Sequence, residues 1–167
     1  MGTTRQIQAD WREWMGLALE QARMAGEMGE IPVGALLLDE QGSLLARDFN
    51  QCIHLQDPTG HAEILTLRRA AKAMGNYRLP GTVMVCTLEP CLMCLGAMTQ
   101  ARVSGLVFGT RDPAGGAVVS RLGYPQELPW LNHHFWWREG FIQDQCADLL
   151  KSFFQARRKG GSAQEKC

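Results

Sequence analysis

The sequence VCTLEPCLMCLGAM, residues 85–98, joins a segment with strand character to a segment with helix character, and two cysteines lie at the junction. Residues 82–87 are rich in β-branched side chains, which predicts a strand. Residues 91–102 have the spacing of a helix. Upstream, DPTGHAEILTLR at residues 57–68 makes the same kind of transition, from a loop into a helix over 61–74. Both segments place residue types that bind metals, one histidine and two cysteines, at the entrance of a helix.

The rest of the chain continues this alternation of strands and helices. Asp10 is a residue type that caps helix N-termini, and apolar residues at helical spacing follow it. In chain order we expect a helix over 10–29, strands over 33–38 and 43–49 joined by a turn at 39–42, a loop over 50–60, a strand over 105–109, a loop over 110–132 with at most one short helix, a strand over 135–139 and a helix over 142–158. This order predicts an α/β sandwich around a sheet that is at least partly parallel.

Length and composition favour one compact domain. The chain has 167 residues, 46% of them hydrophobic, with 17 Lys and Arg against 17 Asp and Glu. The hydrophobic fraction excludes disorder for most of the chain. The equal numbers of basic and acidic residues show that the chain is not basic throughout. The sequence contains neither a bilayer-spanning apolar stretch nor a secretory signal pattern. We expect a cytoplasmic protein in which residues 1–159 form a single domain and residues 160–167 a flexible tail.

Among the six cysteines, only Cys91 and Cys94 form a close pair. In a reducing compartment such a pair indicates metal or thiol chemistry before a disulfide framework. Together with His61 it makes a three-ligand set for which Zn²⁺ is the natural metal. A catalytic zinc keeps its fourth position open for water, whereas a structural zinc fills it with protein. A structural zinc and a redox C-x-x-C pair are the alternatives to a catalytic site.

Glu63 follows His61 by two residues, an offset that makes it a poor fourth ligand but a good neighbour for a bound water. A carboxylate in that position can accept a proton and pass it on, which is what hydrolytic deamination requires.

The other four cysteines need no role in metal binding or catalysis. Cys52, Cys86 and Cys146 are expected to be small buried hydrophobic residues, and Cys167 an exposed thiol.

The motif H-x-E at residues 61–63 and the motif P-C-x-x-C at residues 90–94 together resemble the signature of the zinc-dependent nucleobase deaminases. Longer stretches narrow the resemblance to the bacterial tRNA-specific adenosine deaminases. These stretches are IPVGALLLDE at 31–40, DPTGHAEILTLR at 57–68, VCTLEPCLMCLGAM at 85–98, VFGTRDPAGGAVVS at 107–120 and SFFQARR at 152–158. The resemblance covers residues 10–158.

The resemblance implies a cytidine-deaminase-like fold, a three-layer α/β/α sandwich with a five-stranded mixed sheet, assembled as a homodimer with one Zn²⁺ per subunit. It implies hydrolytic deamination of adenosine to inosine at the wobble position of the anticodon of an arginine tRNA. The implied mechanism uses hydroxide activated by zinc, with a glutamate that moves the protons. The partner is the anticodon stem-loop of tRNA, and no membrane is involved.

The resemblance also assigns roles to individual residues. His61, Cys91 and Cys94 would hold zinc, and Glu63 would move the proton. Asn50 would hydrogen-bond the purine and Val33 would pack on the base. The remaining RNA contacts would come from Arg111 and Asp112 in one loop and from Phe153, Phe154, Arg157 and Arg158 in the last helix. The sequence departs from the family pattern at Cys52, Gln56, Gly60 and Leu95, which are expected at the pocket wall and the anticodon-facing loop.

Several alternatives remain open at this level. The chain could deaminate a free base such as guanine, or it could be an inactive zinc module that binds RNA. Asn50 could be a turn residue, Val33 plain core, and Arg111 with Asp112 a solvated pair. The aromatic run at residues 133–137 could be a base-stacking platform or, more simply, a strand between core and dimer interface. Residues 151–167 contain five cations and one acidic residue, which fits a phosphate-binding edge or solubilising charge.

Overall fold

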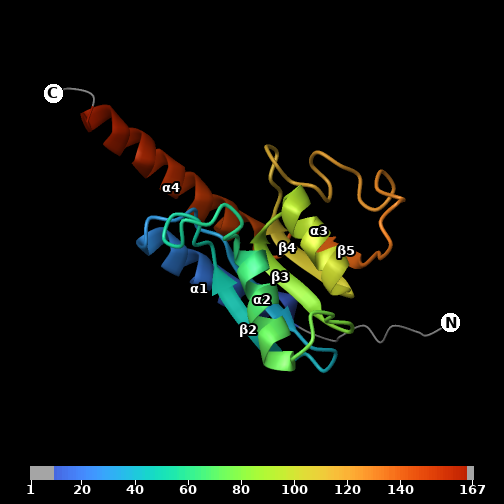
Figure 1. Ribbon diagram of the computed structural model, residues 1–167. Helices are drawn as coiled ribbons and strands as arrows, with labels where there is room; N and C mark the ends of the chain where they lie inside the picture. Colours follow the sequence, from blue (N-terminus) through green and yellow to red (C-terminus); the bar gives the residue numbers. More distant parts are fainter. Residues whose placement is uncertain (1–9, 165–167) are drawn as a thin grey trace.

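The computed structural model describes residues 10–164, with side-chain environments up to residue 159. Its elements in chain order are α1 (Trp11–Glu27), β1 (Gly34–Leu38), β2 (Leu44–Phe49), α2 (Ala62–Met74), β3 (Val83–Leu88), α3 (Leu92–Ala101), β4 (Gly105–Thr110), β5 (Trp136–Glu139) and α4 (Gln143–Gln164) (Figure 1). Every predicted helix and strand is present. Within this described part of the chain, the long loop after β4 contains turns and bends and no helix.

The five strands form one mixed sheet in the order β2-β1-β3-β4-β5. Strand β1 pairs antiparallel with both β2 and β3, whereas β3, β4 and β5 run parallel. The β1–β2 turn is held by Asp39, whose carboxylate accepts hydrogen bonds from the backbone N–H groups of Gln41 and Ser43. Gly42 in this turn has a φ of 81°, which only glycine adopts readily.

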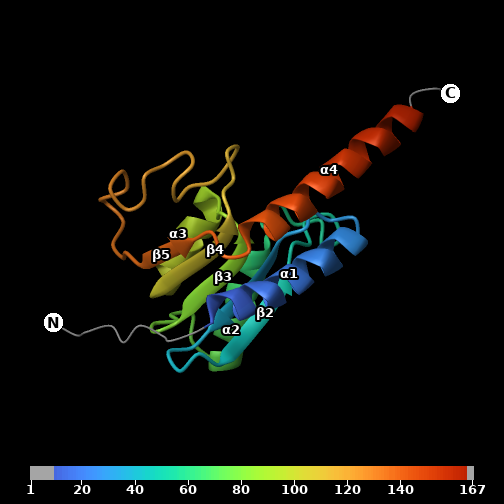
Figure 2. The ribbon, with the colours of Figure 1, turned by 180° about the vertical axis from the view of Figure 1, so that it is seen from behind.

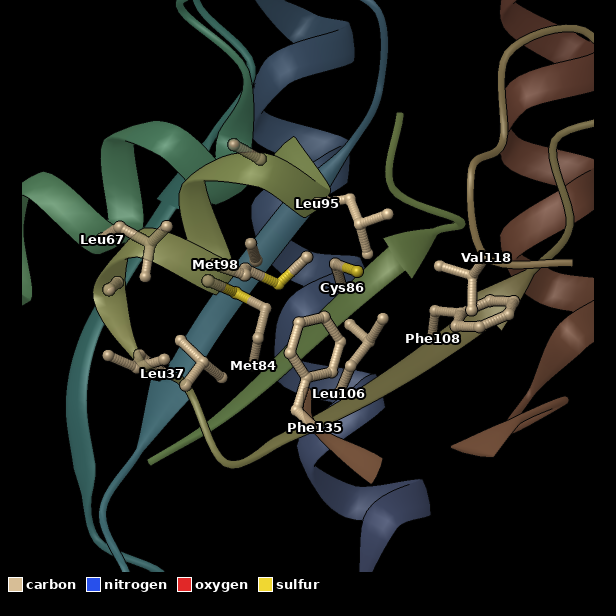
Figure 3. Packing of buried hydrophobic residues seen from close by; sticks show 14 of the residues in the cluster. Leu37, Leu67, Met84, Cys86, Leu95, Met98, Leu106, Phe108, Val118 and Phe135 are labelled. Carbon is tan, nitrogen blue, oxygen red and sulfur yellow. The ribbon is translucent and has the colours of Figure 1, made fainter. Parts of the chain in front are cut away.

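Helices cover both faces of the sheet and make three layers. Because successive side chains of a strand point to opposite faces, Leu36 and Val85 face α1, whereas Leu37, Met84 and Phe108 face α2 and α3. Figure 3 shows the second of these cores, and Figure 2, seen from behind, shows α1 and α4 over the other face. The prediction of an α/β/α sandwich with a five-stranded mixed sheet is confirmed.

The aromatic run before and within β5 packs against other rings of the protein, although only Phe135 is buried. Phe135 is buried, the ring of Trp136 meets Trp11 edge-on at 6.0 Å, and the ring of Trp137 lies 6.1 Å from that of Phe108. A Cβ on Gly105 would lie 2.3 Å from the Trp136 ring, so glycine is required there. This packing favours the simpler interpretation of the run, a strand against the core, over a base-stacking platform.

Two expectations about the ends of elements and the cysteines need correction. Cys86 and Cys146 are buried as expected, but Cys52 is only half-buried because it lies in the loop after β2. Helix α4 continues to Gln164, beyond the predicted end at Arg158, so it includes part of the predicted 160–167 tail. Residues 165–167, with Cys167, lie outside the described residues.

Among the described helices, none is both long and apolar enough to cross a bilayer.

Candidate active site

The predicted zinc ligands lie where α2 and α3 begin. His61 is the N-cap residue of α2 and Cys91 that of α3, and both have extended backbone conformations. Cys94 lies in the first turn of α3 and is buried. Because α2 and α3 pack side by side on the same face of the sheet, the loops that follow β2 and β3 deliver all three side chains to one point.

The geometry of these three residues fits a zinc ion. His61 Nδ1 lies 3.7 Å from Cys91 Sγ and 3.6 Å from Cys94 Sγ, and all three ligand atoms lie within 4.8 Å of one another. Zn–N bonds of about 2.0–2.1 Å and Zn–S bonds of about 2.3 Å at a tetrahedral angle place nitrogen and sulfur about 3.6 Å apart. Among the described residues, no fourth His, Cys, Asp or Glu belongs to the group. The donor set is therefore that of a zinc site with one open position.

The two thiols have opposite pKa shifts, so Cys91 loses its proton more readily than Cys94. Hydrogen bonds from Cys94 and His61 lower the pKa of Cys91 to about 4. The same contact raises the pKa of Cys94, which keeps the proton. The contact with Cys91 also raises the pKa of His61. A thiolate is the form of cysteine that binds zinc, so Cys91 is already in its ligating form at neutral pH.

Glu63 lies in the first turn of α2, with only 3% of its surface exposed. Burial raises the pKa of its carboxyl group, and a hydrogen bond from Cys94 opposes the shift. The side chain thus stands beside the ligand group without belonging to it. Because burial raises its pKa, this carboxyl holds a proton more readily than an exposed glutamate, which suits a group that takes and then gives a proton.

The structure brings Asn50 and Val33 together at the same end of the sheet. The Asn50 backbone N–H donates to the Val33 carbonyl at 3.0 Å, directly after β2. Both side chains are buried, and Val33 also belongs to the core cluster under α2 and α3. The Asn50 amide donates to Glu30 Oε2 at 3.2 Å. Asn50 is therefore held by a side-chain partner, which a simple turn asparagine does not need.

Sequence reasoning missed two buried carboxylates that hold the loops around this site. Glu30 accepts hydrogen bonds from the backbone of the loop after β2, as well as from Asn50. Glu89 accepts hydrogen bonds from the backbone N–H groups of Asp112, Val118, Val119 and Ser120 and from the Ser120 hydroxyl. Burial raises the pKa of Glu89, but these hydrogen bonds outweigh it and lower the pKa overall. The sequence feature that could have identified Glu30 and Glu89 is an acidic residue next to apolar residues that are expected to be buried.

The loop after β4 is packed tightly against Glu89. A Cβ on Gly116 would lie 2.3 Å from the Glu89 carboxylate, so only glycine fits. Gly116 also forms a β-bridge with Cys91, which brings this loop to the ligand group. Arg111, in the same loop, forms a two-bonded ion pair with Glu139 at 2.8 and 2.6 Å, and Asp112 accepts from the Ala114 backbone. Both roles are local, and RNA contact by these residues stays a prediction.

The remaining predicted RNA contacts lie on helix α4, whose C-terminal end extends beyond the sheet (Figure 1). The Phe153 and Phe154 rings lie 5.5 Å apart, and Phe154 is exposed. Arg157 stacks over Phe153 and donates to the Gly29 carbonyl, which ties α4 to the end of α1. Arg158 is exposed. Three of these four side chains therefore also serve internal contacts.

The departures from the family pattern have different structural settings. A Cβ on Gly60 would lie 3.1 Å from the Asp57 carbonyl and 3.2 Å from the Cys52 nitrogen, so the loop is packed for glycine there. Gln56 has a positive φ of 52° in the same loop. Leu95 is fully buried in the core cluster that also contains Val33, and its expected place at the pocket wall stays a prediction.

The fold and the three-ligand site define a class of protein, and the comparisons agree with it. A family model described as the cytidine and deoxycytidylate deaminase zinc-binding region matches residues 9–110, and the chain belongs to this family. The predicted family and the prediction of an enzyme of the deaminase class are thereby confirmed.

Within the family, the chain is similar to proteins that act on tRNA. It is 42% identical over 145 residues to the tRNA-specific adenosine deaminase of Haemophilus influenzae, covering 87% of this chain and 83% of the relative. A solved structure from a study of A-to-I editing by tRNA:A34 deaminases at the wobble position has a TM-score of 0.79 and 41% identity, covering 82% of this chain and 98% of that one. A guanine deaminase from Nitrosomonas europaea shares the fold, with a TM-score of 0.75 and 24% identity, over 89% and 86% of the two chains.

Proposed function

We propose that this protein converts adenosine to inosine at the wobble position of a tRNA anticodon, that of an arginine tRNA, in the cytoplasm. The observation that carries the proposal is the three-ligand group together with the buried Glu63, whose carboxyl interacts with all three ligand residues. The relatives above 40% identity, whose names or studies concern tRNA adenosine, support the substrate. We propose one Zn²⁺ per subunit, held by His61, Cys91 and Cys94.

A zinc ion held by these ligands supplies Lewis acidity that lowers the pKa of water to near 7. Glu63 accepts the proton of the attacking water and delivers it to N1 of the purine. After the water oxygen has added to C6, Glu63 takes the remaining proton from that oxygen and passes it to the amino group. The C6–N bond then breaks, ammonia leaves, and C6 keeps a carbonyl oxygen. Asn50 and Val33 hold the base, because an amide can hydrogen-bond a purine edge while an apolar side chain packs on its face. This assignment gives each buried side chain at the site one task.

The target adenine must leave the stacked anticodon loop to reach this position. A single-stranded loop is the form in which RNA bases are free to do so. We propose that the loop carrying Arg111 and Asp112 and the protruding half of α4 contact the RNA around the flipped base. The cations at the end of α4 support this proposal, because phosphate contacts provide most of the affinity for nucleic acid.

An assay with two substrates tests the proposal. The protein is incubated with an anticodon stem-loop carrying adenosine at the wobble position and, separately, with guanine, while inosine and ammonia are measured. We expect inosine in the stem-loop and no ammonia from guanine. Ammonia from guanine together with an unchanged stem-loop would replace the proposal by a free-base deaminase. No turnover of either substrate would favour an RNA-binding zinc module.

We also propose that the chain forms a homodimer through α2 and α3. A groove of about 380 Å³ lies between these helices, lined by apolar side chains that include Ile64, Ala71, Met93 and Ala97. Tyr77 beside it is 66% exposed. Exposed apolar surface next to a groove is typical of an interface. Sedimentation of the purified protein tests this proposal, with a monomer at micromolar concentration as the contradicting result.

Substitution of Arg158 by alanine is expected to weaken stem-loop binding and to reduce the slope of log affinity against log salt by about 1, because one phosphate contact is lost. Arg157→Ala should also weaken binding, but it removes the contact with Gly29 as well, so Arg158 is the cleaner variant. Arg12→Ala, an exposed cation at the start of α1, is the matched control and should leave the slope unchanged. An unchanged slope for Arg158→Ala would assign this arginine to solvent.

A further inference from the structure

Glu30 is a buried charge whose place in the fold calls for an explanation. It follows α1, and only 1% of its surface is exposed. Among the described residues, it takes part in no ion pair with a lysine or arginine. Burial of a carboxylate without a cation is costly unless several hydrogen bonds compensate for the lost water. The partners that compensate Glu30 therefore decide what this side chain does in the fold.

The hydrogen bonds of the Glu30 side chain all come from the segment that carries Asn50. One oxygen, Oε1, accepts from the backbone N–H groups of Ile53 and His54, both at 2.8 Å. The other oxygen, Oε2, accepts from the side-chain amide of Asn50 at 3.2 Å. The partners lie 20 to 24 residues from Glu30 in the chain. One side chain thus fixes both the backbone of the loop after β2 and the side chain that begins it.

The chemistry of a carboxylate determines which way the amide of Asn50 turns. An ionised carboxylate only accepts hydrogen bonds, so Asn50 must direct its NH₂ group toward Glu30. The Asn50 Oδ1 atom then faces the other way, where Cys52 Sγ donates to it at 3.7 Å. Without Glu30, only the weak and long hydrogen bond from the Cys52 thiol would favour this orientation of the amide. With Glu30, the amide offers a ligand one N–H and one oxygen in fixed positions.

We propose that Glu30 is a positioning residue for deamination, which acts by locking the orientation of the Asn50 amide against the purine. The proposal rests on the proposed function, because it takes the purine as the ligand of Asn50. It assigns Glu30 no contact with the substrate. Loss of the lock should impair binding and orientation of the base, while the zinc ligands and Glu63 stay in place.

A double-mutant cycle tests the proposal. The kcat/KM for the wobble-adenosine stem-loop is measured for the unsubstituted chain, Glu30→Gln, Asn50→Ala and the double variant. Glutamine has nearly the same shape but can present either its NH₂ or its oxygen to Asn50. We expect Glu30→Gln to lower kcat/KM at least ten-fold in the unsubstituted chain and less than two-fold in the Asn50→Ala background. An equal loss in both backgrounds, or no loss in the first, would overturn the proposal.

Two further measurements separate positioning from folding. Asp39→Asn is the matched control, because Asp39 also accepts two backbone N–H bonds. Asp39 lies in the turn between β1 and β2, at the opposite end of this strand pair from Val33 and Asn50, so its substitution should leave kcat/KM unchanged. Zinc content and thermal unfolding are followed for each variant. If Glu30→Gln does not fold, Glu30→Asp replaces it in the same cycle, with the same expected loss of effect in the Asn50→Ala background.

The side-chain NH₂ resonances of Asn50 give a readout that needs no substrate. In the unsubstituted chain we expect two separate proton signals that exchange slowly with water, and in Glu30→Gln signals that broaden and exchange faster. Unchanged signals in Glu30→Gln would overturn the proposal. If the unsubstituted chain does not act on the stem-loop, the proposed function fails, and this measurement still decides whether Glu30 orients Asn50.

Discussion

Replacement of Glu63 by alanine is expected to lower kcat for inosine formation by about 10²–10⁴-fold, the range that positioned acid–base groups contribute. The structure gives the reason, since Glu63 is buried beside the three-ligand group without being part of it. The substitution removes the group that carries protons and leaves the ligands untouched. The measurement is single-turnover inosine formation in the stem-loop, with zinc content and stem-loop affinity determined on the same preparation.

The isosteric variant Glu63→Gln serves as the control for this substitution. It keeps the volume of the side chain and removes only the ability to accept a proton, so we expect a loss similar to that of the alanine variant. Retained zinc and retained RNA binding in both variants would also exclude an inactive binding module. Full turnover in Glu63→Gln would assign the proton transfers to another group.

Replacement of Cys94 by alanine is expected to abolish zinc binding at stoichiometric concentration and, with it, all detectable deamination. Cys94 is fully buried at the start of α3, and its sulfur lies 3.6 Å from His61 Nδ1. Loss of one of three protein ligands leaves two, too few to hold a catalytic zinc tightly. The melting temperature should fall as well, because a ligand that binds only the folded state stabilises it. Elemental analysis and calorimetry measure both effects.

Cys86→Ala is the matched control for Cys94→Ala. Cys86 is also a fully buried thiol, but it faces the core rather than the ligand group. Its substitution removes one small buried atom and should cost about 1 kcal/mol of stability, with zinc content and activity retained. If the two variants lost zinc equally, the metal loss would reflect a general effect of a cavity and not the loss of a ligand.

The fold and the ligand group could be predicted from local patterns. Hydrophobic spacing determines where a helix or strand lies, and Asp10 caps α1 as expected, with its carboxylate accepting from Arg12 and Glu13. The zinc ligands were predictable because their spacing, H-x-E and P-C-x-x-C, is itself local. Each motif lies at the first turn of a helix, so local structure places the side chains at the helix start, and the packing of α2 beside α3 brings the two motifs together.

The residues that organise the loops could not be predicted in the same way. Glu30 and Glu89 bind backbone N–H groups 23 to 31 residues away, and a backbone donor leaves no trace in the side-chain pattern. Cys52 was expected to be buried because free cysteines usually are, but its loop position leaves it half-exposed. The end of α4 was placed too early because Gly160 and Gly161 have low helix propensity.

Return of zinc to the metal-free protein tests the central claim most directly. The chain is treated with a chelator, zinc is added back in steps, and bound zinc and the rate of inosine formation are measured on the same samples. We predict that the rate rises in proportion to bound zinc and reaches its maximum at one ion per chain. Inosine formation that is independent of zinc, or a chain that binds one zinc and never forms inosine, would contradict the account.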